Sequence, residues 1–197
     1  KKKEVRQALY QAIDIEAIKK KVMRGLSEPA GIITFPGVNG YTKDLDKRLP
    51  YDVNAAKQLL ADAGYPNGFD VELRCPNDRY VNDEAICTAV VGMLGKIGVN
   101  VNLFAQTKSK HFKELKDNQG DFYMLGWGVP TLDSHYVFHY LYESGASWNK
   151  VNFSNSEVDA AIRVMEGEVD LDKRNAAIAN AWKIVKDDIS YLPLHHQ

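Results

Sequence analysis

The loop from residue 126 to residue 135, Gly-Trp-Gly-Val-Pro-Thr-Leu-Asp-Ser-His, carries side chains that could bind a small molecule. Its two glycines let backbone atoms approach a ligand closely, and Trp127 offers a flat aromatic face. We expect Trp127 to stack on a ligand and Asp133 to receive a cationic group. Gly128 and His135 belong to the same predicted binding site. The alternative is a tight turn with Trp127 in the core and Asp133 as a helix N-cap, a common position for Asp.

Polar side chains also follow an earlier strand-like run. The stretch Asn77-Asp78-Arg79-Tyr80 comes directly after Pro76, which ends that run. In open α/β sheets, ligands bind outside the carboxyl ends of the strands. Because both loops would occupy such ends, we predict that Asn77, Arg79 and Tyr80 bind the ligand as well.

His135, His139 and Glu143 follow one another at four-residue intervals, which would place them on one face of a helix. A zinc hydrolase needs two imidazoles, a third ligand and a general base. The usual His-Glu-x-x-His arrangement is absent, because Tyr136 follows His135. We expect a solvated histidine face, with no metal ligand, no cofactor and no catalytic residue. A zinc hydrolase built on these three side chains is the alternative from a different functional class.

The elements that position these loops follow an α/β pattern. Apolar residues alternate along Val71–Cys75 and again along Val99–Leu103, with a helical pattern between them. A strand, a helix and a strand in this order form a βαβ unit, whose two strands lie parallel. A third buried strand is expected over residues 122–127. We predict one α/β domain over residues 1–197, with a mixed sheet of βαβ units flanked by helices.

Helical patterns lie on both sides of this unit. Asp14 divides the first pattern, Val5–Met23, into two helices because its side chain can cap the second one. Asp52 caps a helix that ends at Gly64. The remaining expected elements are a long aperiodic loop over 25–50, helices over 109–116, 157–166 and 171–188, and a last strand over 191–194.

The composition excludes several classes of protein. The 197 residues include 25 Lys+Arg and 26 Asp+Glu, a net charge of −1. A nucleic-acid partner is not expected, since such surfaces depend on an excess of basic residues. With 45% hydrophobic and 26% charged residues, the chain has the composition of a folded globular protein. No apolar run reaches the roughly 18 residues typical of a membrane-spanning helix.

Two cysteines, Cys75 and Cys87, are too few for a disulfide framework in a chain of this length. A single bridge requires their Cα atoms to lie within about 7 Å of one another. Free cysteines are among the most buried residues, so two separate, half-buried thiols are the favoured expectation. A disulfide between the two cysteines is the alternative.

Both ends of the sequence look like internal positions. The chain starts with Lys1 rather than Met, and it ends on an extended apolar segment over 191–197. Natural termini more often carry polar residues that fray. We therefore expect the sequence to be a piece of a longer polypeptide.

Five motifs in a fixed order resemble the extracytoplasmic solute-binding proteins of the peptide/nickel ABC importer family, family 5. Each motif is weak alone, but together they run through nearly the whole chain. They are Val5-Arg6-Gln7-Ala8-Leu9-Tyr10-Gln11-Ala12-Ile13-Asp14, Tyr51-Asp52-Val53-Asn54-Ala55-Ala56-Lys57-Gln58-Leu59-Leu60 with Ala63-Gly64-Tyr65-Pro66-Asn67-Gly68-Phe69, Leu94-Gly95-Lys96-Ile97-Gly98-Val99, Asn155-Ser156-Glu157-Val158-Asp159, and Leu192-Pro193-Leu194.

The resemblance implies a binding protein rather than an enzyme. Family members have two lobes joined by a hinge, close around a short peptide, metal chelate or related solute, and deliver it to an ABC importer in the membrane. Residues 1–197 would be most of the later, C-terminal lobe, and the Trp127 loop would face the cleft between the lobes. The implied partners are the missing lobe of the same polypeptide and the membrane permease. The resemblance also implies a monomer that lies in the periplasm or is held on the outer cell surface by a lipid anchor.

One departure from the family pattern concerns the solute. Many peptide-binding members carry an acidic residue three positions after the tryptophan, where it anchors the α-amino group of the peptide. Pro130 occupies that position here, and the nearest carboxylate is Asp133. The loop is also similar to that of the nickel-binding branch, with one extra residue before the Asp. We predict short peptides as the solute, with a metal chelate bound through His135 or His139 as the alternative.

Overall fold

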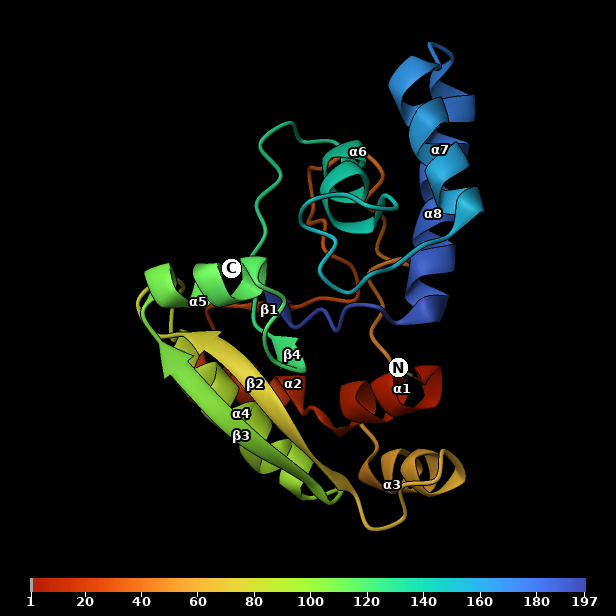
Figure 1. Cartoon of the computed structure of the whole chain (residues 1–197). Helices are drawn as coiled ribbons and strands as arrows, with labels where there is room; N and C mark the ends of the chain where they lie inside the picture. The colour runs from red at the N-terminus through yellow and green to blue at the C-terminus, as the bar shows by residue number, and fades with distance from the viewer. Residues whose placement is uncertain (1) are drawn as a thin grey trace. The chain divides into compact units, whose positions relative to one another are not determined.

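The computed structural model describes residues 2–197, which form two compact units (Figure 1). The first unit comprises the described residues up to Pro29, residues Leu49–Gly126 and residues His195–Gln197. The second comprises Ala30–Arg48 and Trp127–Leu194. The single domain predicted over residues 1–197 stays a prediction. None of the helices within residues 2–197 combines the length with the apolar character that a bilayer crossing requires.

A parallel three-stranded sheet organises the first unit. Its strands β2 (Phe69–Pro76), β3 (Val99–Gln106) and β4 (Phe122–Tyr123) lie in the order β3-β2-β4. β2 pairs in parallel with β3, from Phe69 opposite Val99 to Pro76 opposite Gln106. The predicted βαβ unit and the α/β class are therefore confirmed.

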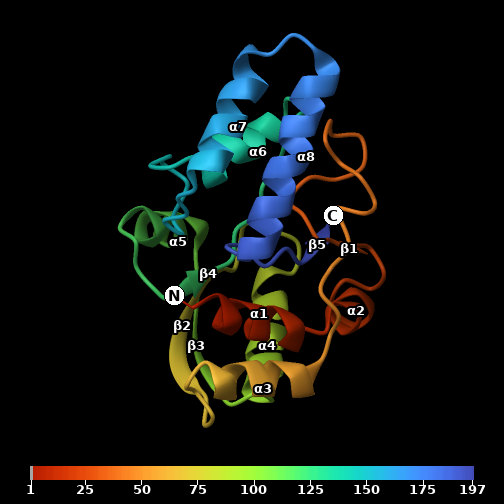
Figure 2. The same cartoon turned by 90° about the vertical axis from the view of Figure 1, so that its right-hand side faces the viewer.

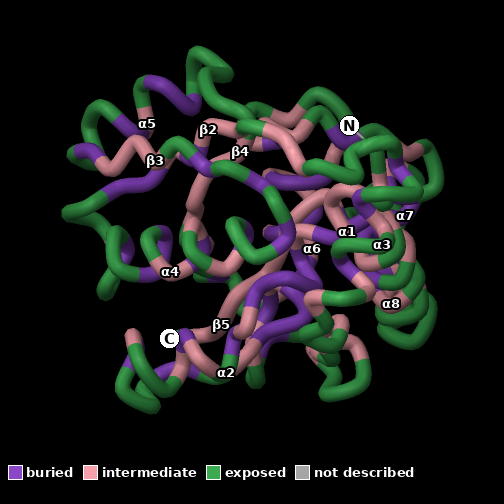
Figure 3. The backbone as a smooth tube through the Cα atoms, turned by 90° about the horizontal axis from the view of Figure 1, so that it is seen from below, coloured by how far each residue is buried: buried purple, intermediate pink, exposed green. Residues whose placement is uncertain are grey.

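Helices of the first unit pack against this sheet. α4 (Asp83–Gly95) packs on β2 and β3, as Figures 1 and 2 show, while α5 (Lys108–Lys116) follows β3. α5 has both buried and exposed parts (Figure 3), and its buried residues His111, Glu114 and Leu115 follow helical spacing. The other elements are α1 (Lys3–Ala12), which packs on α3 (Val53–Asp62), then α2 (Ile15–Ala17) with the π-helical turn η1 (Ile18–Val22), and an antiparallel pair of β1 (Glu28–Pro29) with β5 (His195–His196).

Side-chain caps begin the helices as the sequence predicts. Asp14 accepts a hydrogen bond from the Ala17 N–H at 2.9 Å, and Asp52 accepts one from Ala55 at 2.9 Å. Gly68 precedes β2 with φ +73°, and a side chain there would collide with the backbone of Gly98. A glycine is therefore required where β2 and β3 begin side by side.

Two predicted strands differ from the structure. β4 ends at Tyr123 rather than at residue 127, because the Met124 carbonyl bonds to the His111 ring at 3.0 Å instead of continuing the sheet. The predicted strand over 191–194 is wrong. The Leu194 carbonyl accepts hydrogen bonds from the Ala30 N–H and the Arg48 guanidinium, and strand pairing starts only after it, in β5.

Cys75 and Cys87 form a disulfide, so the expectation of two separate thiols is wrong. Cys75 lies near the end of β2 and Cys87 lies on α4, with their Cα atoms 6.6 Å apart. The α4 crossover brings the two positions together because it packs back onto the strand that precedes it. Sequence spacing alone does not show this proximity.

The helices of the second unit form three segments. α6 (Ser134–Val137) continues into the π-helical turn η2 (Phe138–Tyr142), and α7 (Ser156–Gly167) and α8 (Leu171–Asp188) lie side by side (Figure 2). The helices predicted over 157–166 and 171–188 are confirmed. α6 begins directly after Asp133, as in the alternative that makes Asp133 a helix N-cap. The core of this unit includes Trp182 and Phe138, whose ring centroids lie 4.6 Å apart.

Candidate functional site

Trp127 opens the predicted binding loop and lies in an aromatic group of the second unit. Its ring centroid is 6.0 Å from those of Tyr136 and Tyr140 and 5.9 Å from that of Trp148. All four side chains are half-buried. The indole is therefore neither sealed in a core nor fully exposed, although its Nε1–H is buried and makes no hydrogen bond within the described chain.

The loop that follows leaves backbone accessible. Gly128 is exposed, and a side chain built there would meet nothing within 4 Å. Leu132 adopts a left-handed conformation with φ +53°, which is uncommon for a bulky residue. Its carbonyl accepts the Asn39 N–H at 2.9 Å, so the contact with the 38–40 segment holds this strained turn in place.

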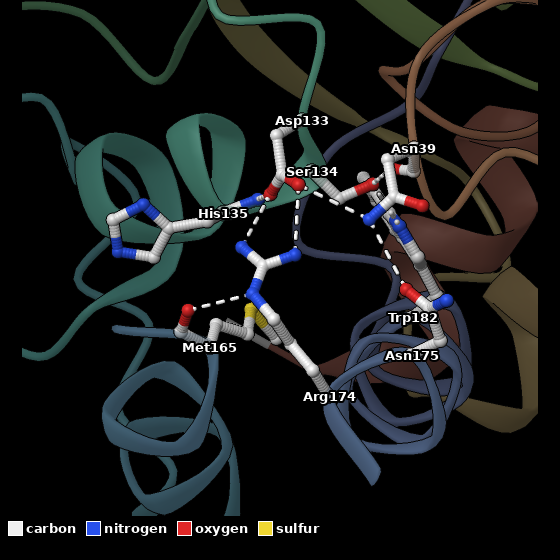
Figure 4. Close-up of polar contacts among 8 residues, drawn as sticks. All are labelled: Asn39, Asp133, Ser134, His135, Met165, Arg174, Asn175 and Trp182. Atoms are coloured by element: carbon white, nitrogen blue, oxygen red, sulfur yellow. Dashed lines mark hydrogen bonds and ion pairs between the residues drawn. The ribbon is translucent and has the colours of Figure 1, made fainter. Parts of the chain in front are cut away.

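Asp133 is surrounded by donors from its own unit (Figure 4). Its Oδ1 accepts hydrogen bonds from the His135 N–H at 2.9 Å and from Arg174 Nη2 at 2.9 Å. Its Oδ2 accepts from Arg174 Nη1 at 2.8 Å and from Asn39 Nδ2 at 3.1 Å. A carboxylate offers about four lone-pair sites, and the chain itself supplies four donors to them. Asp133 is thus the N-cap of α6, and its predicted contact with a ligand cation stays a prediction.

The electrostatics agree with this geometry. Burial would raise the pKa of Asp133, but hydrogen bonds from Arg174, His135 and Asn39 and the charge of Arg174 outweigh it and hold the pKa below its ordinary value. The hydrogen bond to Asp133 likewise raises the pKa of Arg174. The pair is ionised throughout the physiological range.

Ser134 connects the loop to the core of the second unit. Its buried hydroxyl donates to the Asn39 carbonyl at 2.6 Å and accepts from Trp182 Nε1 at 3.2 Å, as Figure 4 shows. Gly40, with φ +89°, leaves no room for a side chain beside Ser134 and Ile178. The segment around Asn39 therefore fixes the start of α6 from a distant part of the sequence.

The second predicted loop lies in the first unit, after β2. Asn77, Asp78 and Arg79 are exposed, and Tyr80 is half-buried. The buried Asp83 carboxylate accepts the N–H groups of Arg79 and Tyr80 at 2.9 and 3.0 Å, and this fixes the backbone of the loop. The Asp78 carboxylate accepts the Lys108 N–H at 2.6 Å. The predicted role of Asn77, Arg79 and Tyr80 in binding stays a prediction.

Tyr80 is the most constrained side chain of this loop. Its hydroxyl donates to the Gly126 carbonyl at 3.4 Å, and burial raises the pKa of the phenol. A side chain at Gly126 would lie 2.6 Å from the Tyr80 ring, so only glycine fits there. The Arg79 guanidinium lies 5.2 Å from the centroid of the same ring.

The two histidines of α6–η2 share one face, as their spacing predicts. Their rings stack with centroids 5.6 Å apart, and both are half-buried. Glu143 Oε2 lies 2.8 Å from His139 Nδ1. Glu166, on α7, places its Oε1 3.3 Å from His135 Nε2 and 3.9 Å from His139 Nδ1. The predicted solvated face is thus partly covered by a carboxylate from another helix.

Three side chains that contact the predicted site were not predicted from the sequence. Asn39, Glu166 and Arg174 contact the loop or its histidines from positions that lie 27 to 94 residues away. Nothing in the local pattern pairs them with Asp133 or His139.

Comparisons with known proteins agree on one group. The model of "Bacterial extracellular solute-binding proteins, family 5 Middle" matches residues 1–149. The chain is 30% identical over 200 residues to heme-binding protein A of Haemophilus influenzae. The alignment covers 98% of this chain and 36% of that protein. It is 28% identical over 198 residues to the dipeptide-binding protein of Escherichia coli, with 98% and 37% covered.

A solved structure gives the same result. The crystal structure of a dipeptide binding protein from Pseudoalteromonas sp. SM9913 in complex with Met-Leu is 27% identical and superposes with a TM-score of 0.89. The match covers 98% of this chain and 39% of that one. The chain thus spans well under half the length of the relatives it matches.

Proposed function

The chain belongs to the bacterial extracellular solute-binding proteins of family 5, and we propose that its polypeptide captures a solute outside the cytoplasm for an ABC importer. The observation that carries this is the family match over residues 1–149. The resemblance seen in the sequence and the predicted lobe of a periplasmic-binding-protein-like fold are thereby confirmed. The relatives are named as binding proteins, and none of those described above is named as an enzyme.

Short peptides are the solute we propose. Two of the relatives described above are dipeptide-binding proteins, and one was solved with Met-Leu bound. Heme-binding protein A shows that a relative of equal similarity takes a different ligand. Ligand choice in such proteins depends on side chains in the loops, and the 126–135 loop supplies an aromatic face and open backbone at Gly128.

Within that loop, Trp127 is proposed to contact the solute directly. Its half-exposed ring is held by three neighbouring aromatic rings, so it offers an ordered surface on which an apolar or aromatic side chain can pack. Asp133 and His135 act by shaping the loop, because the Asp133 carboxylate is already filled by four donors. Asn77, Arg79 and Tyr80 are proposed as further solute contacts from their own loop.

The disulfide supports an extracytoplasmic location. Disulfides persist in the periplasm and on cell surfaces but are rare in the reducing cytosol, and Cys75 and Cys87 are bonded. A second lobe of the same polypeptide, a permease partner, a monomeric state and a surface lipid anchor complete the proposal. They rest on the family alone.

The alternatives differ in their support. A metal chelate bound through His135 or His139 fits the loop sequence and is tested by the same titration as the peptides. The zinc hydrolase built on His135, His139 and Glu143 gains no support from the relatives, which are binding proteins.

Titration calorimetry on the full-length polypeptide tests the proposal. We expect Met-Leu to bind and a nickel–histidine chelate to give no heat. We expect Trp127→Ala to weaken dipeptide binding at least tenfold, since aromatic side chains are frequent binding hot spots. Tyr51→Ala is the matched control, because Tyr51 is an exposed aromatic residue outside both loops. If no dipeptide binds, the peptide assignment is wrong. If Trp127→Ala binds like the unmodified protein, the indole is not a contact.

A further inference from the structure

Four side chains of the second unit gather at one end of α7. His135 and His139 come from α6–η2, Glu143 ends that segment, and Glu166 comes from α7. One ligand atom from each of His135, His139 and Glu166 can be chosen so that the three lie within 4.8 Å of one another. We propose that His135, His139 and Glu166 bind one divalent transition-metal ion of the zinc class, with Glu143 available as a fourth ligand.

The spacing of the donor atoms suits such an ion. Zinc lies about 2.0–2.1 Å from imidazole nitrogen and carboxylate oxygen, so tetrahedral donors are about 3.3–3.4 Å apart. Glu166 Oε1 is 3.3 Å from His135 Nε2 and 3.9 Å from His139 Nδ1. All three donor atoms lie within 4.8 Å of one another, so changes in side-chain torsion angles can bring them to ligand spacing.

The donor types select the class of ion. Two imidazoles and a carboxylate suit zinc, copper or nickel, whereas calcium and magnesium prefer sites made only of oxygen. His139 Nδ1 is buried and makes no hydrogen bond within the described chain, although Glu143 lies 2.8 Å from it. This ring nitrogen therefore lies beside the carboxylates of both Glu143 and Glu166.

The frame that holds these donors is rigid. Val137 and Phe138, which lie between the two histidines, are completely buried, so the exposed face of this turn is fixed. Asp133 holds the His135 N–H, while the His135 ring points away from the Asp133 carboxylate (Figure 4). Arg174 joins Asp133 to the carbonyl of Met165, the residue before Glu166, at 2.8 Å.

The local charge favours a cation. Glu143 and Glu166 bring two negative charges beside the rings of His135 and His139. The ion pairs that Glu166 makes in the described chain are with these histidines, while Arg174 is bound by Asp133. The side chains of His135, His139 and Glu166 are 29%, 42% and 46% exposed, so the cluster lies at the surface of its unit.

This site is separate from the solute contact proposed at Trp127, and it does not depend on the proposed function. The experiment is a titration of the metal-stripped, full-length polypeptide with zinc chloride in a calorimeter, without any solute. We expect one zinc ion per chain. His139→Gln and Glu166→Gln should each weaken zinc binding at least tenfold.

Glu157→Gln is the matched control, because Glu157 is an exposed glutamate on the same helix, α7. It should bind zinc like the unmodified protein. Circular dichroism of each metal-free variant shows that the fold is kept, and dipeptide titration reports the solute site independently. Absence of zinc binding overturns the proposal. Zinc binding that is unchanged in both His139→Gln and Glu166→Gln overturns it as well, because the ion would then lie elsewhere.

Discussion

The ion pair of Asp133 with Arg174 should be a major source of stability in the second unit. Asp133→Asn removes the negative charge but keeps a residue that caps helices as well as Asp does. The substitution therefore keeps the cap, while it removes the charge and the acceptor of the Arg174 Nη1 and Asn39 Nδ2 hydrogen bonds. Asn also keeps the shape of the side chain, so the packing around α6 should change little.

The size of the effect follows from burial. Removing one partner of a buried charge pair costs about 3–5 kcal/mol, whereas an exposed pair contributes only about 0–1 kcal/mol. The side chains of Arg174 and Asp133 are 16% and 23% exposed and are joined by two hydrogen bonds. We expect Asp133→Asn to lower the free energy of unfolding by about 2–3 kcal/mol, between these limits.

Urea denaturation followed by tryptophan fluorescence measures this loss. All three tryptophans lie in the second unit, so the signal reports its unfolding. Asp170→Asn is the control: Asp170 caps α8 and pairs with Lys173 at 3.5 Å, but these side chains are 45% and 71% exposed. Asp170→Asn should lower the free energy of unfolding by less than about 0.5 kcal/mol. Arg174→Gln combined with Asp133→Asn should reveal a coupling of about 1–2 kcal/mol.

The pair also predicts a pH dependence. The pKa of Asp133 is lowered in the folded protein, so its stabilising contribution is complete above the unfolded value of about 3.9. It is lost as the pH falls through the lower folded pKa. Asp133→Asn should therefore lose less stability than the unmodified protein on acidification below about pH 4. The reasoning is refuted if Asp133→Asn and Asp170→Asn are equally stable at neutral pH.

Three further predictions concern the first unit and the chain as a whole. Replacing Cys75 and Cys87 by Ala should lower the free energy of unfolding by about 3 kcal/mol, since the bridge closes a short loop; unchanged urea denaturation by circular dichroism would contradict this. Burial lowers the pKa of His111, so stability should fall as the pH drops below about 6.5, where the unfolded chain takes up a proton that the folded chain does not. A His111→Gln variant with the same slope between about pH 6.5 and 5 would assign the effect to another group. The 197-residue chain alone should fold but bind dipeptides weakly or not at all, because hinge closure needs both lobes; micromolar affinity would show otherwise.

Local patterns in the sequence were sufficient to predict most of the helices and strands. Alternating apolar residues located β2 and β3, helical spacing located α7 and α8, and Asp14 and Asp52 were recognised as caps. Such signals are readable because they depend on neighbours within a few positions. The family motifs were readable for the same reason, since each is a short run of residues.

The failures share a different cause. The strand expected over 191–194 has the residue types of a strand. Arg48 and Ala30, which are distant in sequence, donate hydrogen bonds to the Leu194 carbonyl. The Cys75–Cys87 bridge likewise depends on where α4 packs. Tertiary partners override local preference when they satisfy the same backbone groups.

The sequence alone determined the family, the α/β class and the loop that carries Trp127. Only the tertiary structure decided what the side chains of that loop do. Four donors fill the Asp133 carboxylate, and two of them come from Arg174, 41 residues further along the chain. Glu166 reaches the two histidines from another helix in the same way. Hydrogen bonds and ion pairs act over a few ångströms in space, so the partners that complete a site are set by folding rather than by position in the chain.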